Sequence, residues 1–136
     1  MQTAEFSANG ERMKVVGEIR NQCVFEHWGD IQTEVILTEE RILHIREDHD
    51  DDYEQYGKYI PAAIEMPNII LVDQKDQDTA LFIRHVEATN INVVVKIAYA
   101  VQNTGRKSSV ITMYRLGEKT KARLMKKLKM IYNDQL

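Results

Sequence analysis

The sequence predicts an α+β fold, in which N-terminal helices lead into an antiparallel four-stranded meander sheet and a C-terminal basic amphipathic helix closes the chain. Apolar residues recur at helical spacing over residues 39–49 and 118–133, a pattern typical of amphipathic helices. Between residues 68 and 115 the pattern changes to short β-branched runs separated by polar turns, which indicates strands. Because helices and strands occupy separate parts of the chain, the α+β class is favoured.

Length and composition are those of an ordinary globular protein. The chain has 136 residues, 43% hydrophobic and 29% charged, so it can bury a core and is not a disordered polymer. It contains no apolar run near the roughly 18 residues of a membrane helix, and its single cysteine excludes an internal disulfide. We therefore expect a cytoplasmic protein with no membrane partner, a flexible N-terminus over residues 1–12 and a single domain over residues 13–136.

The first elements are expected to be short strands. Residues 13–20 and 23–28 are partly β-branched or aromatic, and Asn21 and Gln22 separate them, which predicts a hairpin. A third short strand, over residues 35–37, leads into the first helix.

That helix is predicted to begin at Glu39. Thr38 is a favourable N-cap residue, and carboxylates in the first turn interact favourably with the positive end of a helix. Further along, Arg41, His44 and Asp48 are spaced at i, i+3 and i+7, so they share one polar face of the helix.

Four successive strands are predicted after a second, interrupted helix over residues 53–66. The strands cover residues 68–73, 79–86, 92–101 and 108–115. The turns between them are too short for crossover helices, so the strands should form an antiparallel meander. The last predicted element is a helix over residues 118–133, with apolar side chains on one face and lysines on the other.

Alternation along the last two strands indicates which polar side chains share a surface. In the third predicted strand Lys96 points away from the valines that are expected to face the core. In the fourth, Thr112 and Tyr114 are expected on the face opposite to Ile111 and Met113. If the two strands pair, Lys96 lies near Thr112 and Tyr114 on an accessible face.

Charge is distributed unevenly along the chain. Nine of the 18 Lys and Arg residues and one of the 21 Asp and Glu residues lie between Gly105 and Lys129, so this segment carries +8 and the remainder −11. Clustered basic residues favour contact with a polyanion such as nucleic acid. A solvated helix face is the alternative interpretation.

Three stretches of the chain together resemble a nuclease superfamily. They are Leu37-Thr-Glu-Glu-Arg-Ile-Leu-His-Ile45 followed by His49, Val93-Val-Val-Lys96, and Val110-Ile-Thr-Met-Tyr-Arg115. They resemble, over about residues 35–131, the phage-borne members of the superfamily that groups barnase, EndoU, colicin and RelE-type ribonucleases. The resemblance implies helices leading into an antiparallel sheet. It also implies metal-independent ribonuclease activity without a cofactor, often as a toxin.

The resemblance assigns roles to individual residues. The helix histidine of the family's His-Ile motif falls on His44, the strand lysine on Lys96 and the hydroxyl of the final strand on Thr112. RNA cleavage without metal needs a base for the ribose 2′-hydroxyl, a cation for the charged phosphorane and an acid for the leaving 5′-oxygen. We therefore expect His44 to act as base or acid, Lys96 to stabilise charge and Thr112 to bind the phosphate.

Further residues are expected to complete the site. His49 can supply the other half of the acid-base pair, although Asp48 and Asp50 flank it where the family motif tends to run Arg-His-Pro. Substrate contacts are predicted for Arg41, Arg106, Lys107 and Tyr114, the last by stacking on a base or by donating its hydroxyl.

Two functions from different classes remain open. The first is an endoribonuclease toxin of a phage or other mobile element, which acts on tRNA or mRNA and is restrained by an antitoxin or immunity protein. The alternative is a catalytically inactive module of the same fold that binds nucleic acid or protein through the basic helix. A metal site built from His44, Asp48 and His49 is disfavoured, because histidines at i and i+5 lie on different faces of a continuous helix.

Overall fold

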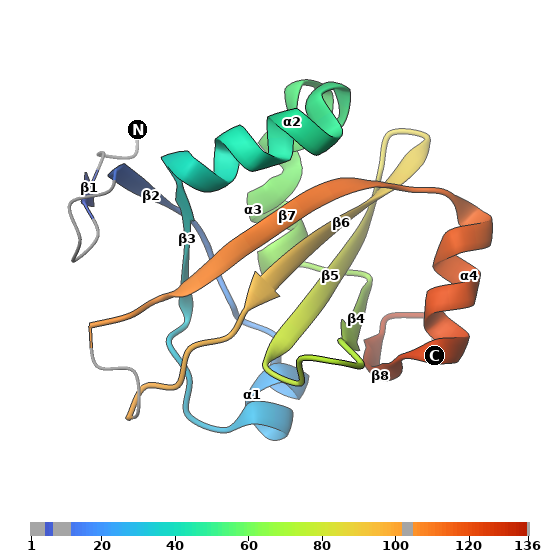
Figure 1. Ribbon diagram of the computed structural model, residues 1–136. Helices are drawn as coiled ribbons and strands as arrows, with labels where there is room; N and C mark the ends of the chain where they lie inside the picture. The colour runs from blue at the N-terminus through green and yellow to red at the C-terminus, as the bar shows by residue number, and fades with distance from the viewer. Residues whose placement is uncertain (1–4, 7–11, 102–104, 136) are drawn as a thin grey trace.

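The computed structural model describes residues 5–6, 12–101 and 105–135, which form eight strands and four α-helices (Figure 1). The strands are β1 (Glu5–Phe6), β2 (Arg12–Glu18), β3 (Glu34–Thr38), β4 (Ile69–Val72), β5 (Thr79–Val86), β6 (Thr89–Lys96), β7 (Ser108–Leu116) and β8 (Lys129–Asn133). The helices are α1 (Gln22–Trp28), α2 (Glu39–Tyr56), α3 (Ile60–Glu65) and α4 (Glu118–Lys127), with a 3-10 turn at Gly57–Tyr59. The α+β class is confirmed. Of the N-terminal residues predicted to be flexible, those numbered 1–4 and 7–11 lie outside the described residues.

The strands form one mixed sheet in the order β1-β2-β3-β7-β6-β5-β4-β8. Every neighbouring pair is antiparallel except β3 and β7, which run parallel. The predicted four-stranded antiparallel sheet is therefore wrong: β4 to β7 are antiparallel neighbours, but β8 extends the sheet at one side, and β3, β2 and β1 extend it at the other. The predicted order of helices before sheet is also wrong, because β2 precedes α1 and β3 follows it.

Residues 23–28, predicted as a strand, lie in helix α1. The side chain of Asn21 caps this helix by accepting a hydrogen bond from the backbone N–H of Cys23 at 2.9 Å. Val24 and Trp28 are four residues apart and both buried, as expected for one face of a helix. Gly29, with a φ of 84°, ends the helix in a conformation that favours glycine. The predicted hairpin is replaced by pairing of β2 with β3.

The basic helix α4 does not close the chain, because it ends at Lys127 and strand β8 follows. Leu128 is already extended, with φ −99° and ψ 157°. Strand β8 pairs antiparallel with β4 and satisfies the backbone groups along its outer edge. Apolar residues 130–132, which suit a helical face, therefore lie in a strand because of a long-range pairing.

Two apolar clusters cover the two faces of the sheet. The main cluster includes Phe82, Val93, Val95 and Met113 from the strands, together with Ile45 from α2 and Ile60 from the start of α3. The second cluster contains Leu71, Leu81, Ile83 and Leu116, against which α4 packs through Leu124, Met125 and Leu128. Helix α4 thus covers the opposite face of the sheet from the main core.

Helix α2 lies along the edge of β7 that β3 leaves unpaired. The parallel pairing of β3 with β7 is confined to Val35 with Ser108 and Ile36 with Ser109. Beyond it, the carboxylate of Asp52 accepts a hydrogen bond from the backbone N–H of Arg115 at 3.0 Å and from its Nε at 2.7 Å. A helix side chain therefore takes the place of a strand partner, and α2 is held beside β7 (Figure 1).

Candidate active site

Strands β6 and β7 present a row of polar side chains on the face opposite to the main core. In the register of the two strands, Asn92 lies opposite Tyr114 and Val94 opposite Thr112. Lys96 is two positions beyond Val94 and points to the same side, because side chains alternate along a strand. We call the surface formed by these five residues the β6–β7 face. The structure thus brings together three of the residues selected from the sequence, namely Lys96, Thr112 and Tyr114.

A bulge explains why alternation along β7 was only partly predicted. The register shifts between Val94 and Val95, so that Thr112 pairs with Val94 but Val110 pairs with Val95. Ile111 is the extra residue of the bulge and is half-buried. The core positions of β7 are consequently Val110 and Met113, not Ile111 and Met113.

The polar stripe of α2 lies on the side of the helix away from Ile42. Ile45 is 1% exposed and Ile42 packs on the main core cluster. At about 100° per residue, Ile42 lies about 60° to one side of Ile45, whereas Arg41, Asp48 and His44 lie about 40°, 60° and 100° to the other. The main core is on the opposite face of the sheet from Lys96 and Thr112. Arg41, His44 and Asp48 therefore lie on the side of α2 away from Ile42.

His44 is accessible and has acidic neighbours on its own helix. Its side chain is 50% exposed, with Nε2 at 3.7 Å from a carboxylate oxygen of Glu40 and Nδ1 at 4.0 Å from one of Glu47. Within the described residues, no hydrogen bond or ion pair joins His44 to Lys96 or Thr112. The two carboxylates lie close enough to orient the imidazole ring.

His49 interrupts α2 and contacts the β6–β7 face directly. Its φ of −144° and ψ of 49° are not helical, so the helix is kinked at this residue. An ion pair of 3.0 Å between Arg46 and Glu54 spans the kink. The kink places the imidazole ring against the ring of Tyr114, with centroids 5.1 Å apart and planes tilted by 32°. The structure therefore brings His49 into contact with Tyr114, another of the residues selected from the sequence.

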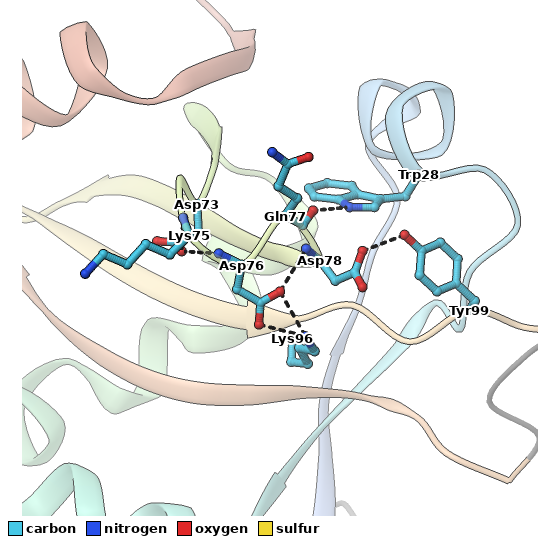
Figure 2. Close-up of polar contacts among 8 residues, drawn as sticks. All are labelled: Trp28, Asp73, Lys75, Asp76, Gln77, Asp78, Lys96 and Tyr99. Carbon is cyan, nitrogen blue, oxygen red and sulfur yellow. Dashed lines mark hydrogen bonds and ion pairs between the residues drawn. The ribbon is translucent and has the colours of Figure 1, made fainter.

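Lys96 is held by a carboxylate that the sequence did not single out. Its Nζ donates hydrogen bonds to both oxygens of Asp76, at 2.7 and 3.0 Å (Figure 2). The pair is about half-exposed. This hydrogen bond from Lys96, with one from the backbone N–H of Asp78, lowers the pKa of Asp76. Because an ammonium has three N–H donors, Lys96 keeps one for a substrate.

The turn that carries Asp76 is fixed by a network of hydrogen bonds (Figure 2). The carboxylate of Asp73 accepts from the backbone N–H groups of Lys75 and Asp76, at 3.1 and 2.9 Å. The indole Nε1 of Trp28 donates to the carbonyl of Gln77 at 2.9 Å. Lys96 is thus positioned by a turn that several separate elements hold in place.

Tyr99 is hydrogen-bonded to the same turn, and its hydroxyl should ionise at a higher pH than that of an ordinary tyrosine. Its hydroxyl donates to Asp78 at 2.6 Å, and this hydrogen bond is the main reason why the pKa of Tyr99 is raised to about 12. Because the folded pKa is raised, the stability from this contact is fully present below pH 10 and is lost as pH rises through about 12. In a phenolate absorbance titration we expect one of the six tyrosines to ionise near pH 12. This late phase should disappear in Asp78→Asn, and its persistence in that variant would refute the assignment.

The predicted contacts at the start of β7 lie apart from His49 and Tyr114. Arg106 is exposed in the turn before the strand. The Nζ of Lys107 is 2.6 Å from a carboxylate oxygen of Glu34. Since Ser109 pairs with Lys96, both cations lie near the Lys96 end of the β6–β7 face.

The exposed basic surface of α4 is a second feature of the same side of the sheet. It comprises Lys119, Arg123, Lys126 and Lys127. The apolar side of the helix is committed to the second core cluster, so these cations point to solvent.

Sequence reasoning missed Asn92 and Asp76. Asn92 interrupts an apolar run in the middle of β6 and is 0% exposed, so a polar residue at a core-like position was the available signal. Asp76 had no such signal, because it lies in a turn distant in sequence from Lys96. Among the described residues there is no group of three or more His, Cys, Asp or Glu side chains arranged to hold a metal ion. No helix in that part of the chain is long and apolar enough to span a membrane.

Comparison with known proteins identifies the family. Residues 7–133 match the family described as phage-Barnase-EndoU-ColicinE5/D-RelE like nuclease2. No curated protein and no solved structure matches the chain. The family match covers nearly all of the sequence, confirms the resemblance carried by the α2, β6 and β7 motifs, and supports a general nuclease function. The chain belongs to the phage-Barnase-EndoU-ColicinE5/D-RelE like nuclease2 family.

Proposed function

We propose that this protein is an endoribonuclease that cleaves RNA without a catalytic metal, by attack of a ribose 2′-hydroxyl on the adjacent phosphorus. The observation that supports this most is that α2, the helix that carries His44, places the ring of His49 against Tyr114 on the face that also carries Lys96 and Thr112. A base, a cation and a hydroxyl are the groups that this reaction requires. Membership of a nuclease family supports the class of reaction.

In the first step His44 accepts the proton of the 2′-hydroxyl, and the oxygen forms a bond to phosphorus. Proton transfer by a positioned side chain contributes roughly 10²–10⁴-fold. The resulting phosphorane carries additional negative charge on its non-bridging oxygens. Lys96 stabilises this charge through the N–H that Asp76 leaves free, and the hydroxyl of Thr112 donates to a second oxygen.

In the second step the bond between phosphorus and the 5′-oxygen breaks. His49 donates a proton to the leaving oxygen, and the products are a 2′,3′-cyclic phosphate and a 5′-hydroxyl. Its ring lies against Tyr114 on the β6–β7 face. Tyr114 contacts the substrate on the same face, while Arg41, Arg106 and Lys107 supply further contacts to phosphates.

The proposed biological role is that of a toxin of a phage or other mobile element. The target RNA is a tRNA or an mRNA, so the protein acts in the cytoplasm. An antitoxin or immunity protein is the proposed partner, because an unrestrained ribonuclease damages the cell that makes it.

The basic surface of α4 should bind the RNA backbone outside the site of cleavage. We expect Lys126→Ala with Lys127→Ala to weaken binding to all RNA sequences alike, and to lower the slope of log K against log salt by about two, roughly one for each lost phosphate contact. Lys14→Ala is the control, because Lys14 lies in β2, near the opposite end of the sheet from β8. This variant should leave the slope unchanged. Fluorescence anisotropy at several salt concentrations measures both quantities. An unchanged slope in the double variant would contradict RNA binding by α4.

The functional test is cleavage of bulk RNA in the presence of EDTA. The proposal expects shortened RNA from the wild-type chain and intact RNA from His44→Ala. The alternative function, a nucleic-acid-binding module without activity, is favoured by the acids around His49 and by the pairing of Lys96 with Asp76. Intact RNA that is nevertheless shifted on a gel, with a steep dependence on salt, would reject the enzyme and support the binding module.

A further inference from the structure

Asn92 is buried at a position where packing alone would favour an apolar residue. It lies in the middle of β6, is 0% exposed, and has Ile83 of β5 and Tyr114 of β7 as its cross-strand neighbours. Its Oδ1 has no hydrogen-bond partner within the part of the chain that the structure describes. Burial of an incompletely satisfied amide is unfavourable, so its presence calls for a reason other than stability.

The amide nitrogen of Asn92 fixes the orientation of the Tyr114 hydroxyl. Nδ2 of Asn92 donates a hydrogen bond to this hydroxyl oxygen at 3.0 Å. Because the oxygen acts as acceptor there, its own hydrogen must point elsewhere. A hydroxyl that would otherwise rotate freely is thereby given a preferred direction.

The ring of Tyr114 already has two sets of neighbours. It packs against the second apolar cluster, which α4 completes, and its other contact is the imidazole of His49 at 5.1 Å. A nucleobase that stacked on the ring where His49 lies would have to displace the imidazole. The hydroxyl is therefore the part of Tyr114 best suited to contact a substrate.

We infer that Tyr114 binds the scissile phosphate by donating its hydroxyl hydrogen to a non-bridging oxygen, and that Asn92 is a positioning residue that aims this hydroxyl. The inference rests on the proposed ribonuclease function and specifies which group on the substrate Tyr114 recognises. Thr112 precedes Tyr114 by two residues on the same face of β7, so both hydroxyls can bind the same phosphate group.

The test is a double-mutant cycle with Tyr114→Phe, Asn92→Val and the double variant. Two quantities are measured: kcat for cleavage of a short RNA, and Kd for the same RNA methylated on every 2′-oxygen so that it cannot be cleaved. Loss of a hydrogen bond to a charged phosphate should lower kcat by about tenfold and raise Kd by about tenfold. If Asn92 acts through the Tyr114 hydroxyl, each single variant should lose about tenfold and the double variant no more than either single one.

Three outcomes would overturn the inference. The first is independent losses that multiply to about a hundredfold in the double variant, as expected if Asn92 only stabilises the fold. The second is a Tyr114→Phe variant that matches the wild type in kcat and Kd, as expected if the hydroxyl donates to Asn92 instead of the phosphate. The third is a wild-type chain that does not bind the methylated RNA at all.

Two further controls keep this test independent of misfolding and of a failure of the proposed function. If Asn92→Val does not fold, Asn92→Ser keeps the position polar and takes its place in the cycle, with folding checked by circular dichroism. If the wild-type chain binds RNA but does not cleave it, the proposed function fails while the cycle measured on Kd still decides the role of Asn92.

Discussion

Replacement of His44 by alanine should abolish most RNA cleavage while leaving the fold intact. The side chain is 50% exposed on α2, so its removal leaves no cavity in the core. If His44 accepts the 2′-hydroxyl proton, kcat should fall roughly 10²–10⁴-fold. The measurement is single-turnover cleavage of a defined RNA, with thermal denaturation to confirm that the variant is folded.

Leu43→Ala is the matched control for this experiment. Leu43 is the neighbouring residue on α2 and is also exposed, at 58%, but it lies on the other side of the helix from Arg41 and Asp48. We expect its replacement to leave kcat within about twofold of the wild type, since Leu43 has no role in the proposed reaction. A His44→Ala variant that cleaves as fast as Leu43→Ala would exclude His44 as the base.

Replacement of Lys96 by methionine should have the second largest effect. Methionine keeps the length of the side chain and removes the charge that we assign to the phosphorane. Loss of one donor to a developing negative charge costs roughly 10²–10³-fold in kcat. The affinity for uncleaved RNA should fall less, because the assigned charge develops during the reaction.

Lys75→Met provides the control for loss of a positive charge near this site. Lys75 lies in the same turn as Asp76, and Figure 2 shows its side chain extending away from Lys96. Both variants lose one lysine, so a general electrostatic effect would weaken cleavage equally. An equal loss in the two variants would contradict a specific role for Lys96.

The alternation of buried and exposed side chains along the strands could be predicted from the sequence. The local pattern predicted the wrong element where pairing between distant segments determines the structure. Val93 and Val95 are buried and Lys96 faces the other way, because one side of β6 packs on the main core. Residues 130–132 suited a helix equally well, and their pairing with β4 made them a strand. Residues 23–28 were interpreted as a strand because of their β-branched and aromatic residues, and Asn21, which was taken as part of a turn, caps helix α1 in the structure.

The candidate site was predictable in its parts but not in its contacts. Motif residues identified His44, Lys96 and Thr112 as candidates, and the structure places Lys96 and Thr112 on the same face of β6 and β7, with His44 exposed on α2. The ion pair between Asp76 and Lys96 depends on the conformation of a turn, which strand periodicity does not describe. The approach of His49 to the β6–β7 face depends on a kink in α2 that a regular helical pattern cannot reveal.

The chemical identity of the cleaved ends tests the central claim most directly. An RNA oligonucleotide is incubated with the wild-type chain in EDTA, and the products are identified by mass spectrometry. Attack by the ribose 2′-hydroxyl predicts a 2′,3′-cyclic phosphate on one fragment and a 5′-hydroxyl on the other, and no cleavage where the 2′-hydroxyl is replaced by hydrogen. Fragments with a 5′-phosphate, formed only when a divalent metal is added, would contradict the proposed mechanism.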